Sequence, residues 1–117
     1  LELENLEIMP KAIAPEMGDE ARFRFGVTPR IEDPNLREAR RLNFTAELYD
    51  MNGRRVKTIF REEAFTLDEL EAAEPPERNL IDGRGDDGRI LNGGVYLLRI
   101  VLEPGQDQAV EGMVVVR

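Results

Sequence analysis

The sequence predicts an all-β fold, a sandwich of about seven antiparallel strands with at most one short helix. The first observation is that apolar and polar residues alternate in several short runs, the pattern of strands that bury one face. The second is that clusters of Gly, Pro, Asn and Asp separate these runs at the spacing of turns in a sandwich. We expect residues 1–117 to form one domain, and because the chain begins with Leu1 we expect a piece of a longer protein.

Two strands are predicted in the first part of the chain, each followed by a loop. The first strand covers Leu1–Met9, and the break in its alternation at Asn5 predicts a bulge. The second covers Glu20–Thr28, where apolar residues at every second position face the core. We expect loops at Lys11–Glu20, which contains Pro and Gly, and at the polar insertion Arg30–Arg41.

A β-hairpin is predicted over Leu48–Ile59, where the strands on both sides of the turn alternate apolar and polar residues. The turn has the composition of a type I turn that ends in a residue with positive φ. The Asp50 carboxylate can accept a hydrogen bond from the N–H two residues further on. Gly53 can adopt the left-handed conformation without a Cβ clash.

An acidic connection, Arg61–Arg78, follows the hairpin. Thr66 and Glu69 have the spacing of a capping box, which predicts a short helix over Leu67–Ala73. We interpret the acidic residues as a solvated connection. The alternative is a surface that binds cations or a basic partner.

Three further strands are expected in the last part of the chain. Asn79–Asp82 is a short strand, and the segment Gly83–Gly94 has the composition of consecutive turns. Val95–Leu102 is the most hydrophobic strand and is expected at the centre of its sheet, and Ala109–Arg117 is the last strand. Within it, Val114–Val116 is expected to be paired with a neighbouring strand, although an edge open to a partner strand is an alternative.

The composition excludes several classes of function. A net charge of −8 argues against a nucleic-acid partner, because such binding requires neutralisation of phosphates. No apolar run is long enough for insertion into a membrane. The chain lacks Cys, His, Ser and Trp, which removes thiolate metal sites, disulfides, most nucleophiles and the usual general base. We therefore expect no enzyme activity and no cofactor; a carboxylate-based enzyme is a remote alternative. The sequence carries no signal for an oligomeric state.

A calcium site is the one metal site that the sequence raises. Asp82, Asp86 and Asp87 form an oxygen-rich cluster between glycines. An EF-hand loop, however, requires Gly in its sixth position, where this chain has Asp87. We therefore interpret the three residues as caps of turns and predict no metal.

A set of short motifs carries a resemblance to a known family: Tyr49-Asp50, Gly53-Arg54, Asp82-Gly83, Asp87-Gly88 and Gly94-Val95-Tyr96. Through these motifs the chain resembles the immunoglobulin-like domain of the flagellar hook-capping protein. It is also similar to C-terminal modules of secreted bacterial proteins, including type IX secretion sorting domains. Ile81 stands where the family usually has Trp.

The resemblance implies an immunoglobulin-like or fibronectin III-like sandwich. It also implies a non-catalytic accessory module of an exported bacterial protein, located outside the cell, at its surface or in the periplasm. Such a module would act in protein–protein interaction, scaffolding, or C-terminal secretion and anchoring. Its partners would be other domains of the parent protein or a protein at the cell surface. A carbohydrate-binding module is the alternative, which the absence of Trp weakens.

The residues of these motifs have structural roles in physical terms. The glycines Gly53, Gly83, Gly88 and Gly94 give backbone freedom in tight turns, and the aspartates accept backbone N–H groups within their own turns. The Tyr96 ring is expected in the core, with its hydroxyl on a carbonyl of a nearby connection, as in the tyrosine corner of sandwich folds.

Overall fold

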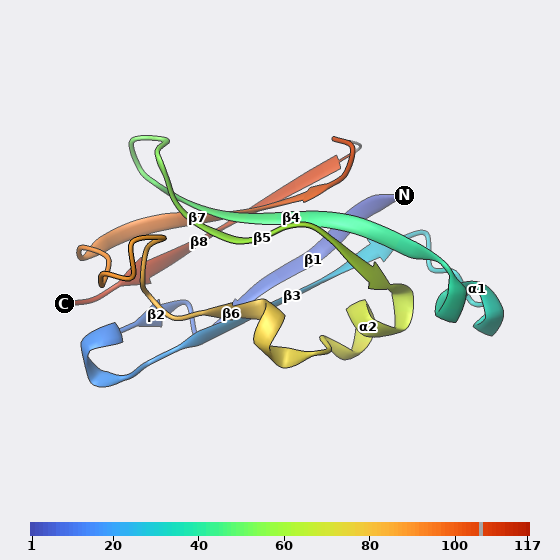
Figure 1. The fold of residues 1–117 in the computed structure, drawn as a ribbon, viewed down its shortest axis with the longest axis horizontal. Coiled ribbons are helices and arrows are strands. Elements are labelled where there is room, and N and C mark those ends of the chain that lie inside the picture. Colours follow the sequence, from blue (N-terminus) through green and yellow to red (C-terminus); the bar gives the residue numbers. More distant parts are fainter. Residues whose placement is uncertain (106) are drawn as a thin grey trace.

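The computed structural model describes residues 1–105 and 107–117 and confirms the all-β sandwich (Figure 1). A three-stranded sheet has the order β1 (Glu2–Met9), β3 (Ala21–Thr28), β6 (Leu80–Ile81). A five-stranded sheet has the order β2 (Ala12–Ile13), β8 (Asp107–Val115), β7 (Gly94–Leu102), β4 (Arg41–Asp50), β5 (Arg55–Thr66). β7 lies at the centre of its sheet, as predicted, and β4 with β5 forms the predicted hairpin. No helix in the described part of the chain combines the length and apolarity that a membrane span needs.

The N-terminal segment passes from one sheet to the other. β1 pairs with β3, and Asn5 has a φ of 53° where the register shifts, which confirms the predicted bulge. The segment Lys11–Glu20, predicted as a loop, contains β2 and a short 3₁₀ helix, η1 (Pro15–Met17). β2 pairs with β8 in the parallel direction, so the sandwich is not antiparallel throughout. A strand of two residues is too short to show an alternating pattern, which is why the sequence did not predict it.

The core lies between the two sheets and contains all five phenylalanines. Their rings form one connected group; for example, the Phe25 and Phe44 ring centres are 4.9 Å apart in an edge-to-face arrangement. Burial of each ring contributes about 2 kcal/mol through the area removed from water. Ile81 is 3% exposed and packs in this core.

The polar insertion Arg30–Arg41, predicted as a loop, contains a second short helix, α1 (Pro34–Ala39). Asp33 is its N-cap and accepts a hydrogen bond from Asn35 N–H at 2.9 Å, and Pro34 occupies the first turn. Both residues are typical of a helix start. Residues 1–105 and 107–117 therefore contain two α-helices where at most one was expected. α1 buries none of its own residues, so the sequence has no apolar periodicity that would predict this helix.

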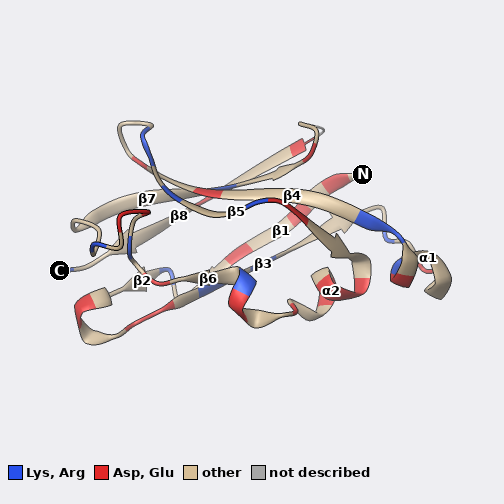
Figure 2. Cartoon of the chain, viewed as in Figure 1, with Lys and Arg blue, Asp and Glu red and all other residues tan. Residues whose placement is uncertain are grey.

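The acidic connection Arg61–Arg78 begins as strand and not as loop, because β5 continues to Thr66. The capping box of Thr66 and Glu69 is present and starts α2 (Leu67–Ala72), as predicted. A 3₁₀ helix, η2 (Pro76–Asn79), then leads into β6. Figure 2 shows the acidic residues of this connection on β5 and α2.

Candidate interaction surface

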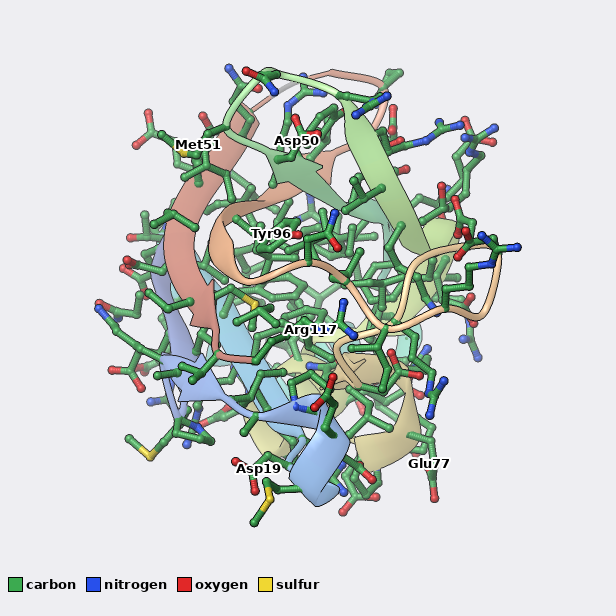
Figure 3. The ribbon with its side chains drawn as sticks, turned by 90° about the vertical axis from the view of Figure 1, so that its left-hand side faces the viewer. Asp19, Asp50, Met51, Glu77, Tyr96 and Arg117 are labelled. Carbon is green, nitrogen blue, oxygen red and sulfur yellow. The ribbon has the colours of Figure 1, made fainter. Side chains whose placement is uncertain are left out.

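The hairpin of β4 and β5 and the turn segment 83–94, far apart in sequence, meet at one end of the sandwich (Figure 3). Asp86 N–H donates to the Val56 carbonyl at 3.0 Å. In return, the Asp86 carboxylate accepts Thr58 N–H at 3.0 Å. The turn segment 83–94 therefore lies along the edge of β5 and covers it at these residues.

The hairpin turn is organised by Asp50. Its carboxylate accepts the N–H of Asn52 and the N–H of Arg54, each at 2.9 Å. The Arg54 backbone hydrogen bond is the largest cause of the lowered pKa of Asp50, and its burial acts in the opposite direction. Gly53 has a φ of 80°, as the turn type predicts. The hairpin prediction is confirmed in its atomic detail.

The aspartates of the turn segment are also bonded to backbone. Asp82 accepts Arg84 N–H at 3.0 Å, and Asp87 accepts Arg89 N–H at 2.9 Å, as predicted for turn caps. Lys57 Nζ lies 3.9 Å from the Asp82 carboxylate. In residues 1–105 and 107–117, the structure brings no three acidic side chains together in a group that could hold a metal.

Gly83 packs against η1. Its φ is 74°, and a Cβ atom at this position would lie 2.2 Å from Pro15 Cγ. Gly88 also has positive φ, at 80°. The motif glycines therefore allow turns and, at Gly83, a close approach between two segments.

Tyr96 confirms the predicted corner. Its ring is 6% exposed, and its hydroxyl donates to the Asn92 carbonyl at 2.7 Å. Burial is the main cause of the raised pKa of Tyr96, followed by the nearby charge of Asp50; Arg117 acts in the opposite direction. Between the hairpin and the turn segment there is a polar pocket of about 320 Å³, lined in part by Asp50, Asp87 and Tyr96.

The outer face of the five-stranded sheet carries exposed and half-buried apolar side chains beside this end. We call this set the outer face: Tyr49, Met51, Val95, Leu97, Val110 and Val114. The exposed fractions are 65% for Met51, 44% for Val95, 53% for Val110 and 39% for Val114. These residues are neighbours, because Tyr49 pairs with Leu97 and Val95 with Val114. They form an apolar surface that no other element of the described chain covers.

The outer face is hollowed beside the hairpin. A depression of about 360 Å³ is lined by residues that include Tyr49, Met51, Leu97 and Val110. Gly112, opposite Leu97, has no side chain to fill it. An apolar side chain from another molecule would therefore find an apolar floor and wall here.

Polar groups border the outer face. Glu47 is 9% exposed and accepts hydrogen bonds from the Tyr49 hydroxyl at 3.2 Å and from Arg55 Nη1 at 3.1 Å. Arg99 Nε donates to the Gln108 side chain at 2.7 Å. This surface was not predicted from the sequence. The signal available was that the end of β8 is apolar at consecutive positions, from Met113 to Val115, and so on both of its faces.

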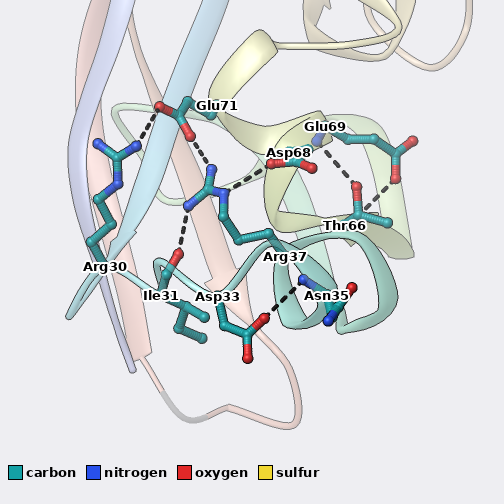
Figure 4. A network of polar contacts seen from close by, with 9 residues as sticks. All are labelled: Arg30, Ile31, Asp33, Asn35, Arg37, Thr66, Asp68, Glu69 and Glu71. Carbon is teal, nitrogen blue, oxygen red and sulfur yellow. Dashed lines mark hydrogen bonds and ion pairs between the residues drawn. The ribbon is translucent and has the colours of Figure 1, made fainter.

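At the opposite end, the polar insertion is bound to α2 (Figure 4). Arg37, whose side chain is 13% exposed, pairs with Asp68 at 2.9 Å and with Glu71. It also donates to the Ile31 carbonyl at 2.8 Å. Arg30 pairs with the other oxygen of Glu71 at 3.4 Å. These acidic residues, expected to be solvated, hold the insertion in place.

No protein-family model matches the chain, and no curated protein matches it. Two solved structures from Porphyromonas gingivalis are similar to it in fold. One is PorZ, an essential bacterial surface component of the type IX secretion system: TM-score 0.58, 16% identity, 97% of this chain and 12% of that chain. The other is dimeric latent PorU: TM-score 0.61, 22% identity, 95% of this chain and 9% of that chain. At these identities the likeness shows a shared fold. The resemblance to the flagellar hook-capping domain stays a prediction.

Proposed function

We propose that this chain is a non-catalytic accessory module of an exported bacterial protein and that it binds another protein domain through its outer face. The observation that carries the proposal is the group of exposed apolar side chains at Met51, Val95, Val110 and Val114. Apolar patches with a polar border are typical of protein interaction sites. The hollow between the hairpin and β8 would accept an apolar side chain of the partner.

The structural neighbours support the setting. PorZ is described as a surface component of a secretion system, and the chain spans 12% of PorZ and 9% of PorU. A sandwich of this size inside much longer chains works beside other domains. Surface location and secretion-related scaffolding are therefore part of the proposal.

The residue chemistry supports a role without catalysis. The chain has no His, Cys or Ser, and the motif aspartates are engaged by backbone N–H groups. Carbohydrate binding has no comparable support. Sugar platforms require exposed aromatic faces, whereas the five phenylalanines and Tyr96 are buried and Tyr49 is half-buried.

The test uses the full-length parent protein in its own host. Val95→Lys with Val110→Lys places charge on the outer face at exposed positions. The matched control is Met9→Lys with Met17→Lys, at apolar residues that are 73% and 81% exposed elsewhere on the surface. We expect both double variants to fold and only the outer-face variant to lower the amount of parent protein at the cell surface severalfold. Equal surface amounts for the two would refute the proposal.

The mass of the mature parent protein distinguishes a removable sorting signal from a permanent domain. β7 is central in its sheet, and β8 pairs along its whole length with it. Cleavage inside the sandwich would therefore expose the core, so the chain must be kept or removed as a whole. Peptides from Gly94–Arg117 and peptides from Leu1–Met9 should share one fate, absent for a sorting signal and present for a permanent domain.

A further inference from the structure

The last strand, β8, has a free edge along part of its length. Val114 N–H donates to the Lys11 carbonyl at 2.8 Å, away from β7. Because N–H groups alternate in direction along a strand, the even-numbered residues before Val114 also direct their backbone groups away from β7. β2, however, pairs only with Val114 and Val115. The segment Val114–Val116 was predicted to be paired, with an open edge as the alternative, and it is thus paired. The open part of β8 lies before this segment in the sequence.

We call Gln108, Val110 and Gly112 the free edge. No strand of the described chain pairs with these residues on the side away from β7. Gly112 N–H donates to the side chain of its neighbour Glu111, at 3.2 Å, and not to a strand. Exposed N–H and C=O groups in a row are a template for an additional strand.

Other strand edges of the same sheet are covered in part. On β5, the turn segment bonds Val56 and Thr58 through Asp86. On β2, Ala14 N–H, directly after the strand, donates to the Asp19 carboxylate at 3.0 Å. Such coverage prevents unwanted pairing.

Apolar side chains border the free edge on both sides of the sheet. On the outer side, Val110 is 53% exposed. On the inner side lies β1, a strand of the three-stranded sheet that runs close to β8 (Figure 1). Its Leu3 and Leu6 are only partly buried against the core, and Leu3 N–H reaches the Asp107 carboxylate at 2.7 Å. A strand added here would bury apolar surface on both of its faces.

The two strands beside the free edge, β1 and β8, carry charges of one sign, and one basic residue of β7, Arg99, donates to Gln108. β1 and β8 together contain five acidic residues and no Lys or Arg: Glu2, Glu4, Glu7, Asp107 and Glu111. Figure 2 shows acidic residues along β1. Lys11, at the end of this stretch, lies 3.5 Å from Glu111. A second copy of the chain, with a net charge of −8, would be repelled, whereas a basic segment would be attracted.

We propose that the free edge accepts an extended, basic segment of a partner protein, which adds a strand to the five-stranded sheet next to β8. The segment would alternate apolar residues with Lys or Arg and bond to the backbone of Gln108, Val110 and Gly112. This inference rests on the proposed function, because both make the chain a protein-binding module. It uses the backbone of one strand edge for binding, whereas the outer face acts through its side chains; Val110 belongs to both.

The experiment measures binding of two short synthetic peptides to the chain, one alternating Lys and Val and the other alternating Glu and Val. Amide hydrogen exchange is read residue by residue. We expect the Lys–Val peptide to slow exchange at Val110 and Gln108 at least about tenfold at saturation. The Glu–Val peptide should bind at least about tenfold more weakly, and added salt should reduce the difference.

Two variants separate backbone from side chain. Val110→Pro removes an N–H that points away from β7 and leaves the β7 ladder intact, so it should fold and lose peptide binding. Val110→Ala keeps the N–H and should retain binding within about threefold. Protection outside the free edge, equal binding of both peptides, or self-association of the chain through β8 would each overturn the proposal. If Val110→Pro does not fold, the protection pattern of the unaltered chain decides. Failure here would leave the outer-face result in the parent protein unaffected.

Discussion

The guanidinium carbon of Arg78 lies 3.7 Å from the centre of the Phe65 ring, which is 1% exposed. The same guanidinium donates to the Ala64 carbonyl at 3.0 Å and to Glu69 at 3.1 Å. Arg78 belongs to η2 and Ala64 and Phe65 to β5, so this contact attaches the end of the acidic connection to the sheet.

Replacing Arg78 by Ala should lower the free energy of unfolding by about 2 kcal/mol, because it removes the contact with the ring and three hydrogen bonds, the third of them to the Glu74 carbonyl. The control is Arg22→Ala, which removes an exposed hydrogen bond to the Pro76 carbonyl in the same 3₁₀ helix and should cost less than about 0.5 kcal/mol. Urea unfolding of both variants measures the two values. Equal losses would show that the Phe65 contact adds nothing.

Two glycines with similar backbone angles should respond differently to a methyl group. Gly53 and Gly83 have φ of 80° and 74°, so Ala is strained at both. A Cβ at Gly53 meets no atom within 4 Å, and Gly53→Ala should cost about 1 kcal/mol. A Cβ at Gly83 would lie 2.2 Å from Pro15 Cγ, so Gly83→Ala should cost more than about 2 kcal/mol. Thermal melts of the two variants compare them, and a Gly83→Ala melt as high as that of Gly53→Ala would contradict the packing of η1.

The capping box makes the free energy of unfolding depend on pH in the acid range. The pKa of Glu69 is lowered from its ordinary value of 4.5, chiefly by the hydrogen bond from Thr66 N–H and against the effect of burial. A lowered folded-state pKa means that the stabilisation is present above pH 4.5 and is lost as the pH falls through the folded value. Glu69→Gln should therefore show a smaller loss of stability between neutral pH and acid than the unaltered chain. Glu77→Gln, at an exposed residue of η2, should leave that pH dependence unchanged in urea titrations.

Features encoded by neighbouring residues were predictable from sequence. The Asp50–Gly53 turn and the Thr66–Glu69 capping box each depend on residues within one turn of each other, and both are present as predicted. α1 has equally local signals in Asp33 and Pro34, but its lack of a buried face removed the periodic pattern that marks a helix.

Features that depend on distant residues were not predictable. The parallel pairing of Ala12 with Val114 and the contact of Asp86 with Val56 require knowing which segments meet. The outer face and the free edge also depend on segments that are distant in the sequence. The apolar run at the end of β8 indicates that both of its faces are apolar there. Whether Val110 is covered depends on which other segments lie beside it, and that run does not contain this information.

The contacts of Arg37 with α2 and with the Ile31 carbonyl, here called the clamp, should keep the insertion ordered. They should contribute little to the stability of the sandwich. α1 buries none of its own residues, so its attachment depends on Arg37 with Asp68, Glu71 and the Ile31 carbonyl. Arg37→Ala should speed amide exchange at Arg40, whose N–H bonds to the Leu36 carbonyl, by about tenfold or more, while the main thermal transition shifts little. The matched control is Arg40→Ala, at an exposed residue that directly follows the same helix. In this variant amide exchange is read at Arg37, whose N–H bonds to the Asp33 carbonyl. If both variants exchange alike, α1 is held by its Asp33 cap and not by the clamp. Loss of the whole sandwich in Arg37→Ala would show that α2 depends on the insertion as much as the insertion depends on α2.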